Sequence, residues 1–408
     1  MTAQTLALTG TAFHTPERGR LEVLEEHLFC VDAQGRIDAV LPPNHPQYGA
    51  RKEAARQAGA LVELSDGQFL LPGLVDLHIH APQWPQMGKA LDVPLEVWLQ
   101  KYTFPLEARY VDVGYAREVY ADLVDNLLAN GTTTALYFAT VHVEASLALA
   151  EICLEKGQRA LVGKVVMDDP EQCPPFYRDA DAILAVSDTR RFIEAVRALD
   201  GGERPLVLPV ITPRFIPSCT DEALSGLGEL ARDYGCHVQT HCAESDWAKA
   251  FVEQRFGRTD AASLDGFGLL TRHTILAHSN FIDGEDMDLI ERQGAGVAHC
   301  PLSNFYFANA VFPLREALDR HMHVGLGTDI SGGYSPSLFD GCRHALSASR
   351  TLQSGVHAGL PAHERGASGE PITHLEAFWL ATAGGAEALD RSSSSSDPAC
   401  RMSMRRPA

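Results

Sequence analysis

The stretch that decides the fold is Leu70-Leu71-Pro72-Gly73-Leu74-Val75-Asp76-Leu77-His78-Ile79-His80, and the rest of the chain is arranged around it. Its apolar and β-branched residues predict a buried strand that ends in two histidines. Because side chains alternate between the faces of a strand, His78 and His80 project to the same side. Two imidazoles at one strand end supply half of a metal site. An isolated pair of this kind is also typical of histidines that hydrogen-bond within a core, so later segments must decide.

Beyond this run, apolar strand patterns alternate with amphipathic helices. Strands are predicted at 133–138, 160–166, 206–211, 237–241, 274–278, 296–299 and 323–329. Helices are predicted between them at 115–129, 145–156, 188–199 and 222–234, and a last helix at 375–389. With the opening strand, these segments make eight β/α units, the number that closes a parallel barrel. We therefore predict an α/β fold, with a (β/α)8 TIM-type barrel over residues 71–390.

Two segments lie outside the barrel. Residues 1–70 hold short strand patterns and one short helix at 52–60, which predict a small β-sandwich module that is too thin to build a large core alone. Residues 391–408 begin with Arg391 and five serines and end in a basic stretch, which predicts a disordered tail.

Composition excludes several classes of function. The net charge is −19, from 34 basic and 53 acidic residues, and no basic stripe predicts a nucleic-acid partner. No apolar run is long enough to span a membrane, which argues against insertion. Nine cysteines form no Cys-x-x-Cys pair, and the N-terminus lacks a charged-then-apolar leader. These features favour the reducing cytosol.

The strand ends carry the candidate chemistry, because barrels of this type place catalytic groups at the C-terminal ends of their strands. The predicted ends hold imidazole, guanidinium and carboxylate groups, namely His78 and His80, Arg214, His241, His278, His299 and Asp329. Three of these histidines (His78, His80, His241) and Asp329 form a ligand set that zinc accepts while it keeps one position for water. Zinc makes such a water a usable nucleophile near neutral pH. Iron stays open, because imidazole suits both metals. A core role for His241 and a helix N-cap role for Asp329 are the structural alternatives.

Glu244 and His278 are the candidate proton-transfer groups. Glu244 follows His241 by three residues, so it lies just past the strand and can face the metal-bound water. A carboxylate there can take a proton and return it to a ring nitrogen or a leaving group. His278 can polarise the attacked centre or hold the water. The alternatives are helix capping or a surface ion pair for Glu244, and a purely supporting role for His278.

Three further residues suit a flat heteroaromatic ligand. The Arg214 guanidinium can donate two parallel hydrogen bonds to a ring carbonyl and a neighbouring nitrogen, while Phe215 stacks on the ring. Gln83 can donate and accept at the other edge. A salt bridge at the barrel rim for Arg214 and core packing for Phe215 remain open. His299 is the weakest candidate and can equally be structural.

Taken together, these segments resemble the amidohydrolase superfamily and, within it, the guanine deaminases. Residues 72–80 resemble the opening motif of the superfamily. More specific similarities are Ala81-Pro82-Gln83, Trp98-Leu99-Gln100-Lys101-Tyr102-Thr103-Phe104-Pro105, Asn130-Gly131-Thr132-Thr133-Thr134, Thr212-Pro213-Arg214-Phe215, His241-Cys242-Ala243-Glu244, His299-Cys300-Pro301-Leu302-Ser303-Asn304 and Gly327-Thr328-Asp329-Ile330-Ser331-Gly332-Gly333. The resemblance extends to about residue 389.

The resemblance implies a zinc enzyme of purine breakdown, usually a homodimer, that converts guanine and water to xanthine and ammonia. It implies one zinc on His78, His80, His241 and Asp329, and guanine held by Gln83, Arg214 and Phe215 beside His241, Glu244 and Asp329. Glu244 then protonates a ring nitrogen, His278 assists at the amino-bearing carbon, and Asp329 accepts a proton from the attacking water.

The resemblance also raises an expectation about the tail and leaves other functions open. Family members continue past the last barrel helix with strands that complete the small β domain, and these strands appear missing here, so we expect an incomplete module with exposed edges. One alternative is a related amidohydrolase that deaminates another heterocycle, such as a nucleoside, a pterin or a triazine. The other is an inactive, shortened chain that acts as a dimer partner.

Overall fold

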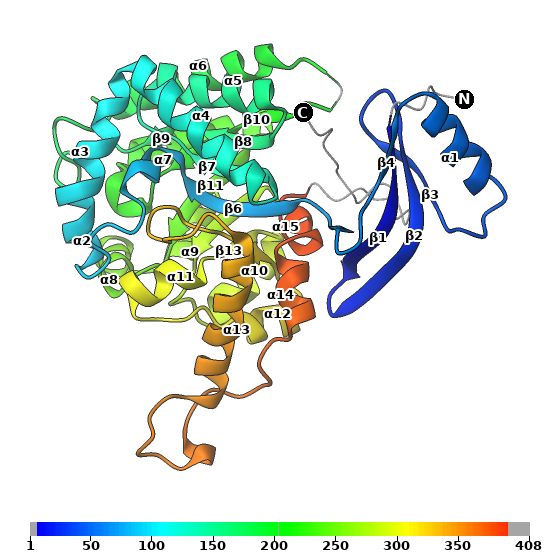
Figure 1. Cartoon of the computed structure of the whole chain (residues 1–408). Coiled ribbons are helices and arrows are strands. Elements are labelled where there is room, and N and C mark those ends of the chain that lie inside the picture. The colour runs from blue at the N-terminus through cyan, green and yellow to red at the C-terminus, as the bar shows by residue number, and fades with distance from the viewer. Residues whose placement is uncertain (1–5, 203, 391–408) are drawn as a thin grey trace.

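Parallel strands surrounded by helices form a barrel, and a smaller sheet lies beside it (Figure 1). The computed structural model describes residues 6–202 and 204–390. The barrel strands are β6 (Leu74–His80), β7 (Thr132–Phe138), β8 (Arg159–Gly163), β9 (Val165–Val166), β10 (Val207–Pro213), β11 (His237–Cys242), β12 (Thr274–His278), β13 (Gly296–His299) and β14 (His323–Leu326). Their order is β14-β13-β12-β11-β10-β8-β7-β6, with β9 also on β10, so the predicted barrel of eight β/α units is confirmed.

The barrel closes between its first and last strands through the segment that follows β14. The amide of Asp329 donates to the carbonyl of His78 at 2.8 Å, and the amide of His80 donates to the carbonyl of Ile330 at 2.9 Å. The strand predicted at 323–329 ends at Leu326, and three residues later Asp329 has a positive φ of 49°, outside the extended conformation. Closure therefore places Asp329 directly against the two histidines of β6.

Most helices lie outside the strands and cover the barrel (Figure 1). They are α4 (Val113–Ala129), α5 (Val143–Lys156), α6 (Ala182–Leu199), α7 (Asp221–Tyr234), α8 (Asp246–Phe256), α9 (Asp260–Gly266), α10 (Gly284–Gln293), α12 (Leu314–Asp319) and α13 (Leu338–Ser354). Shorter helical turns occupy the connections, namely η1 (Ala81–Gln86), α2 (Leu95–Trp98), η2 (Leu99–Thr103), α3 (Phe104–Glu107), η3 (Ala108–Val111), η4 (Ile216–Ser218), α11 (Pro301–Ser303), η5 (Asn304–Ala308) and η6 (Ala362–Glu364). The helices predicted at 115–129, 145–156, 188–199 and 222–234 correspond to α4 to α7.

The last predicted helix, at 375–389, is wrong as a single element. The structure has two short helices instead, α14 (His374–Leu380) and α15 (Ala383–Ala388). The carbonyl of Ala381 accepts a hydrogen bond from the amide of Val75 at 2.9 Å, so it serves the start of β6 rather than a continuing helix. A Cβ on Gly385 would lie 3.0 Å from Cβ of Val75, which shows how closely α15 packs beneath this strand.

The small sheet contains β1 (Leu6–Glu17), β2 (Arg20–Val31), β3 (Ile37–Leu41), β4 (Leu61–Glu63) and β5 (Phe69–Leu70). Their order is β3-β2-β1-β4, with β5 also on β1, and the helix α1 (Tyr48–Gln57) packs on one face. Where the sequence predicts an incomplete sandwich, the structure shows one mixed sheet, beside α14 and α15 (Figure 1). The predicted tail, 391–408, lies outside the described residues. Within the described part, no helix combines the length and apolarity needed to cross a bilayer.

Candidate active site

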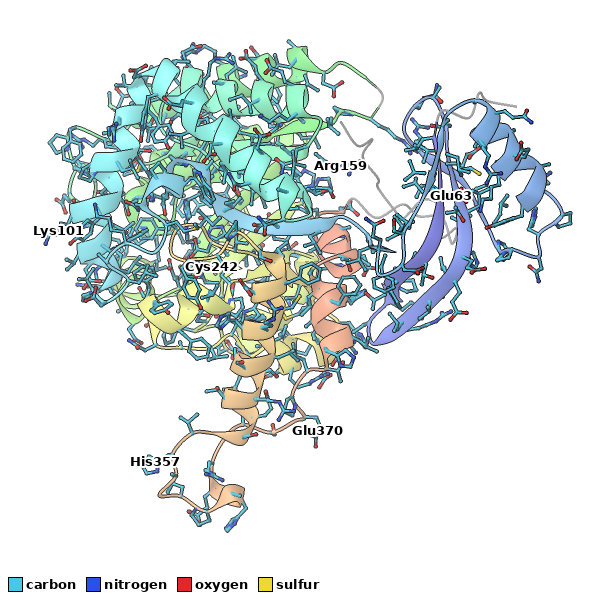
Figure 2. All side chains as sticks on the ribbon, viewed as in Figure 1. Glu63, Lys101, Arg159, Cys242, His357 and Glu370 are labelled. Atoms are coloured by element: carbon cyan, nitrogen blue, oxygen red, sulfur yellow. The ribbon has the colours of Figure 1, made fainter. Side chains whose placement is uncertain are left out.

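Four histidines and one aspartate from separate strand ends meet in the barrel mouth. His78 and His80 come from β6, His241 from β11, His278 from β12 and Asp329 from the segment after β14. Figure 2 labels Cys242, the residue after His241, and shows it inside the barrel, away from Glu63 on the small sheet. The Nε2 atoms of His80 and His241 are 3.1 Å apart, and Oδ1 of Asp329 is 3.1 Å from Nε2 of His78 and 3.4 Å from Nε2 of His80.

Hydrogen bonds on the far side of two rings orient these histidines. Nδ1 of His241 donates to the carbonyl of Arg214 at 2.6 Å, and Nδ1 of His278 donates to Oδ1 of Asn304 at 2.9 Å. Such outer bonds place the proton on Nδ1 and leave the Nε2 lone pair for the cluster. Burial lowers the pKa of all four cluster histidines, so the rings are neutral near pH 7.

The donor set fits a divalent metal ion. His78, His80 and Asp329 form one group of potential ligands and His78, His241 and His278 another, with the ligand atoms of each group within 4.8 Å of one another. Two ligand atoms bound to one zinc ion lie about 2.9–3.5 Å apart, which matches the observed separations. Nε2 of His78 has no hydrogen-bond partner among the described residues, although it is fully buried. Neutral ring nitrogens that face each other without a proton donor are explained by a cation between them.

Asp76 supports this cluster from below. Its carboxylate accepts from the amide of Thr328 at 3.0 Å, from Oγ1 of Thr328 at 2.5 Å and from the amide of His78 at 3.2 Å. Asp76 thus ties β6 to the segment that carries Asp329. Burial raises the pKa of Asp76 to about 7, against the lowering effect of the Thr328 hydrogen bonds. Its position two residues before His78, on the same side of the strand, is a signal that sequence reasoning missed.

Glu244 lies where the sequence places it, just past β11. The chain turns sharply at Ala243, which has a φ of 43°, and Nδ2 of Asn280 donates to the carbonyl of Glu244 at 3.0 Å. Oε1 of Glu244 is 3.6 Å from Nε2 of His278. Burial and the charge of Asp329 raise the pKa of Glu244 well above its ordinary value, although Arg214 opposes them. A buried carboxyl of this kind can carry a proton near neutral pH.

A pocket opens at the cluster, and His80, His241 and Asp329 are part of its lining. All the predicted catalytic, binding and metal-ligating residues line it except His78 and His278. Its remaining wall is largely apolar and comes from Leu95, Trp98, Leu99 and Phe307. The rings of Trp98 and Phe307 are 5.1 Å apart, so helical turns from two distant segments meet at the pocket. A pocket with apolar walls and a few polar groups suits a small aromatic ligand.

Arg214, Gln83 and Phe215 all reach this pocket, but Arg214 differs in detail from the sequence prediction. Its NH1 donates to Oε2 of Glu107 at 2.6 Å and its NH2 to Oε1 at 3.1 Å. The pair of parallel donors predicted to grip a ring is therefore directed at a protein carboxylate. Nε2 of Gln83 donates to Oε1 of the same Glu107 at 2.9 Å. The Phe215 ring lies 6.3 Å from the His241 ring.

His299 is buried, does not line the pocket, and its ring nitrogens have no hydrogen-bond partner among the described residues. Burial and neighbouring His278 lower the pKa of His299 to about 3. Its ring lies 5.5 Å from the ring of Phe312. This environment favours the structural alternative.

Sequence reasoning also missed Glu107, which lies two residues beyond the Trp98 to Pro105 similarity.

Known proteins are similar to this chain over most of its length. The model of the amidohydrolase family matches residues 69–395. A probable guanine deaminase of Schizosaccharomyces pombe is 39% identical over 390 residues, which cover 94% of this chain and 71% of that protein. The guanine deaminase of Mus musculus is 37% identical over 388 residues, which cover 94% of this chain and 82% of that protein. A crystal structure of guanine deaminase from C. acetobutylicum with bound guanine in the active site has a TM-score of 0.83 at 30% identity. The match covers 94% of this chain and 86% of that one.

The family match, the relatives and the histidine–aspartate cluster at the barrel mouth agree. The chain belongs to the amidohydrolase family.

Proposed function

We propose that this chain is a metal-dependent hydrolase that converts guanine and water to xanthine and ammonia. The observation that carries the proposal is the meeting, in one pocket, of a buried histidine–aspartate cluster with Arg214 and Gln83, which can read a polar ring. Relatives named guanine deaminase that are 35–39% identical over more than nine-tenths of this chain support the choice of ring.

We propose that the metal is zinc, held by His78, His80, His241 and Asp329. Iron is the alternative, and elemental analysis of the purified protein distinguishes the two metals. When bound, such an ion lowers the pKa of water and withdraws electrons from the attacked centre. Nδ1 of His241 supports this role because its bond to the Arg214 carbonyl leaves Nε2 aimed at the cluster. His278, whose Nε2 is 3.9 Å from Oδ2 of Asp329, is proposed to face the amino-bearing carbon.

The side chains supply the proton transfers. Water adds its oxygen to C2 of guanine, and the bond from C2 to the amino nitrogen breaks. Asp329 accepts a proton from the water, and Glu244 donates one to N3 beside C2, where it stays in xanthine. As the intermediate collapses, Glu244 takes the proton of the new C2 hydroxyl, Asp329 returns its proton to the amino group, and ammonia leaves. Leu95, Trp98 and Phe307 supply an apolar wall to the pocket in which these groups lie.

Ammonia release from guanine tests this function. Zinc-loaded protein is expected to release ammonia from guanine. Its kcat/KM for adenosine, a pterin and an aminotriazine should be at least ~100-fold lower than for guanine. Turnover of another ring but not guanine would support a related heterocycle deaminase. Full zinc occupancy with no turnover of any of these rings would instead support an inactive dimer partner and reject the proposal.

A homodimer in the cytosol completes the proposal. The segment between α13 and α14 extends away from the barrel, and Figure 2 labels His357 and Glu370 on it. It exposes Val356 (76%) and Leu360 (41%), which are suited to burial against a second copy. Light scattering after size-exclusion chromatography should give twice the mass of one chain, and a monomer would contradict this. Cell fractionation tests the compartment.

A further inference from the structure

Glu107 is a fully buried carboxylate between the two polar side chains that read the ring. It ends the four-residue helix α3 and has none of its surface exposed. A carboxylate is unfavourable in the interior unless donors satisfy it. Here Arg214 provides two hydrogen bonds and Gln83 one, at 2.6 to 3.1 Å. Burial and the nearby Glu107 carboxylate raise the pKa of Tyr177 well above its ordinary value, so its hydroxyl stays protonated.

These bonds decide which donors Arg214 has left for a ligand. A guanidinium has five N–H groups in one plane, and Glu107 uses one on each terminal nitrogen. Phe104 packs against the guanidinium, with its ring centre 5.0 Å from Cζ, and so restricts its tilt. NH1 also donates to Sδ of Met167 at 3.9 Å. Because Arg214 lines the pocket, the N–H groups left on Nε and NH2 are its candidate donors for a ring.

The same carboxylate fixes the orientation of the Gln83 amide. Glu107 accepts hydrogen bonds and cannot donate them when ionised, so it selects Nε2 of Gln83 rather than Oε1. Oε1 then faces the amide of Ser331 at 3.3 Å. Ser331 lies two residues past Asp329. Gln83 therefore connects Glu107 to the loop that carries Asp329.

Charge follows from the same geometry. Burial tends to lower the pKa of Arg214, but the attraction of Glu107 and its hydrogen bonds prevail and raise it, so Arg214 stays cationic. The Arg214–Glu107 pair is then neutral overall. A ligand carrying a negative charge gains little from a cation that is already paired.

We propose that Glu107 is a positioning residue that sets substrate choice: it aims Arg214 and Gln83 at an uncharged ring that carries an oxygen, and it disfavours anionic rings. This inference rests on the proposed function, because guanine is the ring whose oxygen is read.

The test compares Glu107→Gln with Glu376→Gln. Glu376 also pairs with an arginine, because NH2 of Arg315 donates to both of its carboxylate oxygens at 3.0 and 2.9 Å, but it lies outside the pocket lining. It therefore controls for the loss of an arginine–glutamate pair. The substrates are guanine and 2-aminopurine, which lacks the carbonyl oxygen of guanine but keeps the amino group. Purine-6-carboxylate serves as an anionic inhibitor.

The Glu107→Gln variant should raise KM for guanine ~10–100-fold, change kcat by less than ~5-fold and keep its zinc. Its preference for guanine over 2-aminopurine should fall by at least ~10-fold, and inhibition by purine-6-carboxylate should strengthen ~10-fold. The Glu376→Gln variant should match the unaltered enzyme in all three. If Glu107→Gln does not fold, Glu107→Asp keeps the charge but is one methylene too short to hold both partners, and should lose preference in the same direction.

The two failures are distinguishable. If unaltered, zinc-loaded protein does not deaminate guanine, the proposed function fails. If it does, and the Glu107 variants match Glu376→Gln in KM, preference and inhibition within ~3-fold, the positioning role is overturned.

Discussion

Replacing Glu244 with glutamine removes proton transfer while it keeps the size of the side chain. The hydrogen bond that anchors this residue runs from Asn280 to the Glu244 backbone carbonyl, so the substitution leaves it intact. Glu244 lies in the pocket wall, 3.6 Å from Nε2 of His278, where it can reach both water and ring. General acid–base catalysis contributes ~10²–10⁴ in rate, so kcat should fall by this factor, or about 3–5 kcal/mol in activation free energy.

Steady-state ammonia release from guanine measures this loss, and elemental analysis of the same sample measures zinc. KM should stay within ~3-fold, because Glu244 acts mainly on the transition state. Glu253→Gln is the matched control, since Glu253 lies on the following helix with 47% of its side chain exposed and outside the pocket lining. A Glu244→Gln enzyme that keeps its zinc and more than about a third of its kcat would refute the proton-transfer role.

Three further perturbations test the structure around the site. Asp329→Ala should lose its metal by elemental analysis and reduce kcat/KM at least ~100-fold; retained metal with full activity would remove Asp329 from the ligand set. Gly333→Ala should destabilise the Asp329 loop by about 1–3 kcal/mol in chemical denaturation and weaken zinc retention, because its Cβ would lie 1.9 Å from the carbonyl oxygen of Thr328. Gly49→Ala, which meets nothing within 4 Å, is the control and should not weaken zinc retention. Burial raises the pKa of Asp260 from 3.8 to about 7, so the folded chain holds this proton more tightly than the unfolded chain and loses stability as the pH rises through that interval. Asp260→Asn stays neutral and should flatten the dependence of the unfolding free energy on pH between about 4 and 7, by at most about 4 kcal/mol over that interval; an unchanged slope in calorimetry would show that Asp260 does not titrate there.

The barrel could be predicted because its strands carry their own signal. Each one is a short apolar run, and the polar residue at its end, such as His241 or His278, follows from the architecture once the strands are counted. Counting the strands also predicts that His78, His80, His241 and Asp329 meet, and the separations of their side-chain atoms agree with this.

What could not be predicted lies in contacts between distant segments. The break between α14 and α15 depends on the amide of Val75, more than 300 residues earlier, taking the carbonyl of Ala381. The pairing of Arg214 with Glu107 likewise joins residues 107 positions apart. A four-residue helix such as α3 shows no periodicity, so nothing local indicates that its glutamate is buried.

The most direct test of the account is a zinc titration of metal-free protein, with bound zinc and guanine-dependent ammonia release measured on each sample. We predict that activity rises in proportion to bound zinc and levels off at about one ion per chain. Full ammonia release from protein without a detectable metal ion, or a chain that binds no zinc at all, would contradict the shared ligand site of His78, His80, His241 and Asp329.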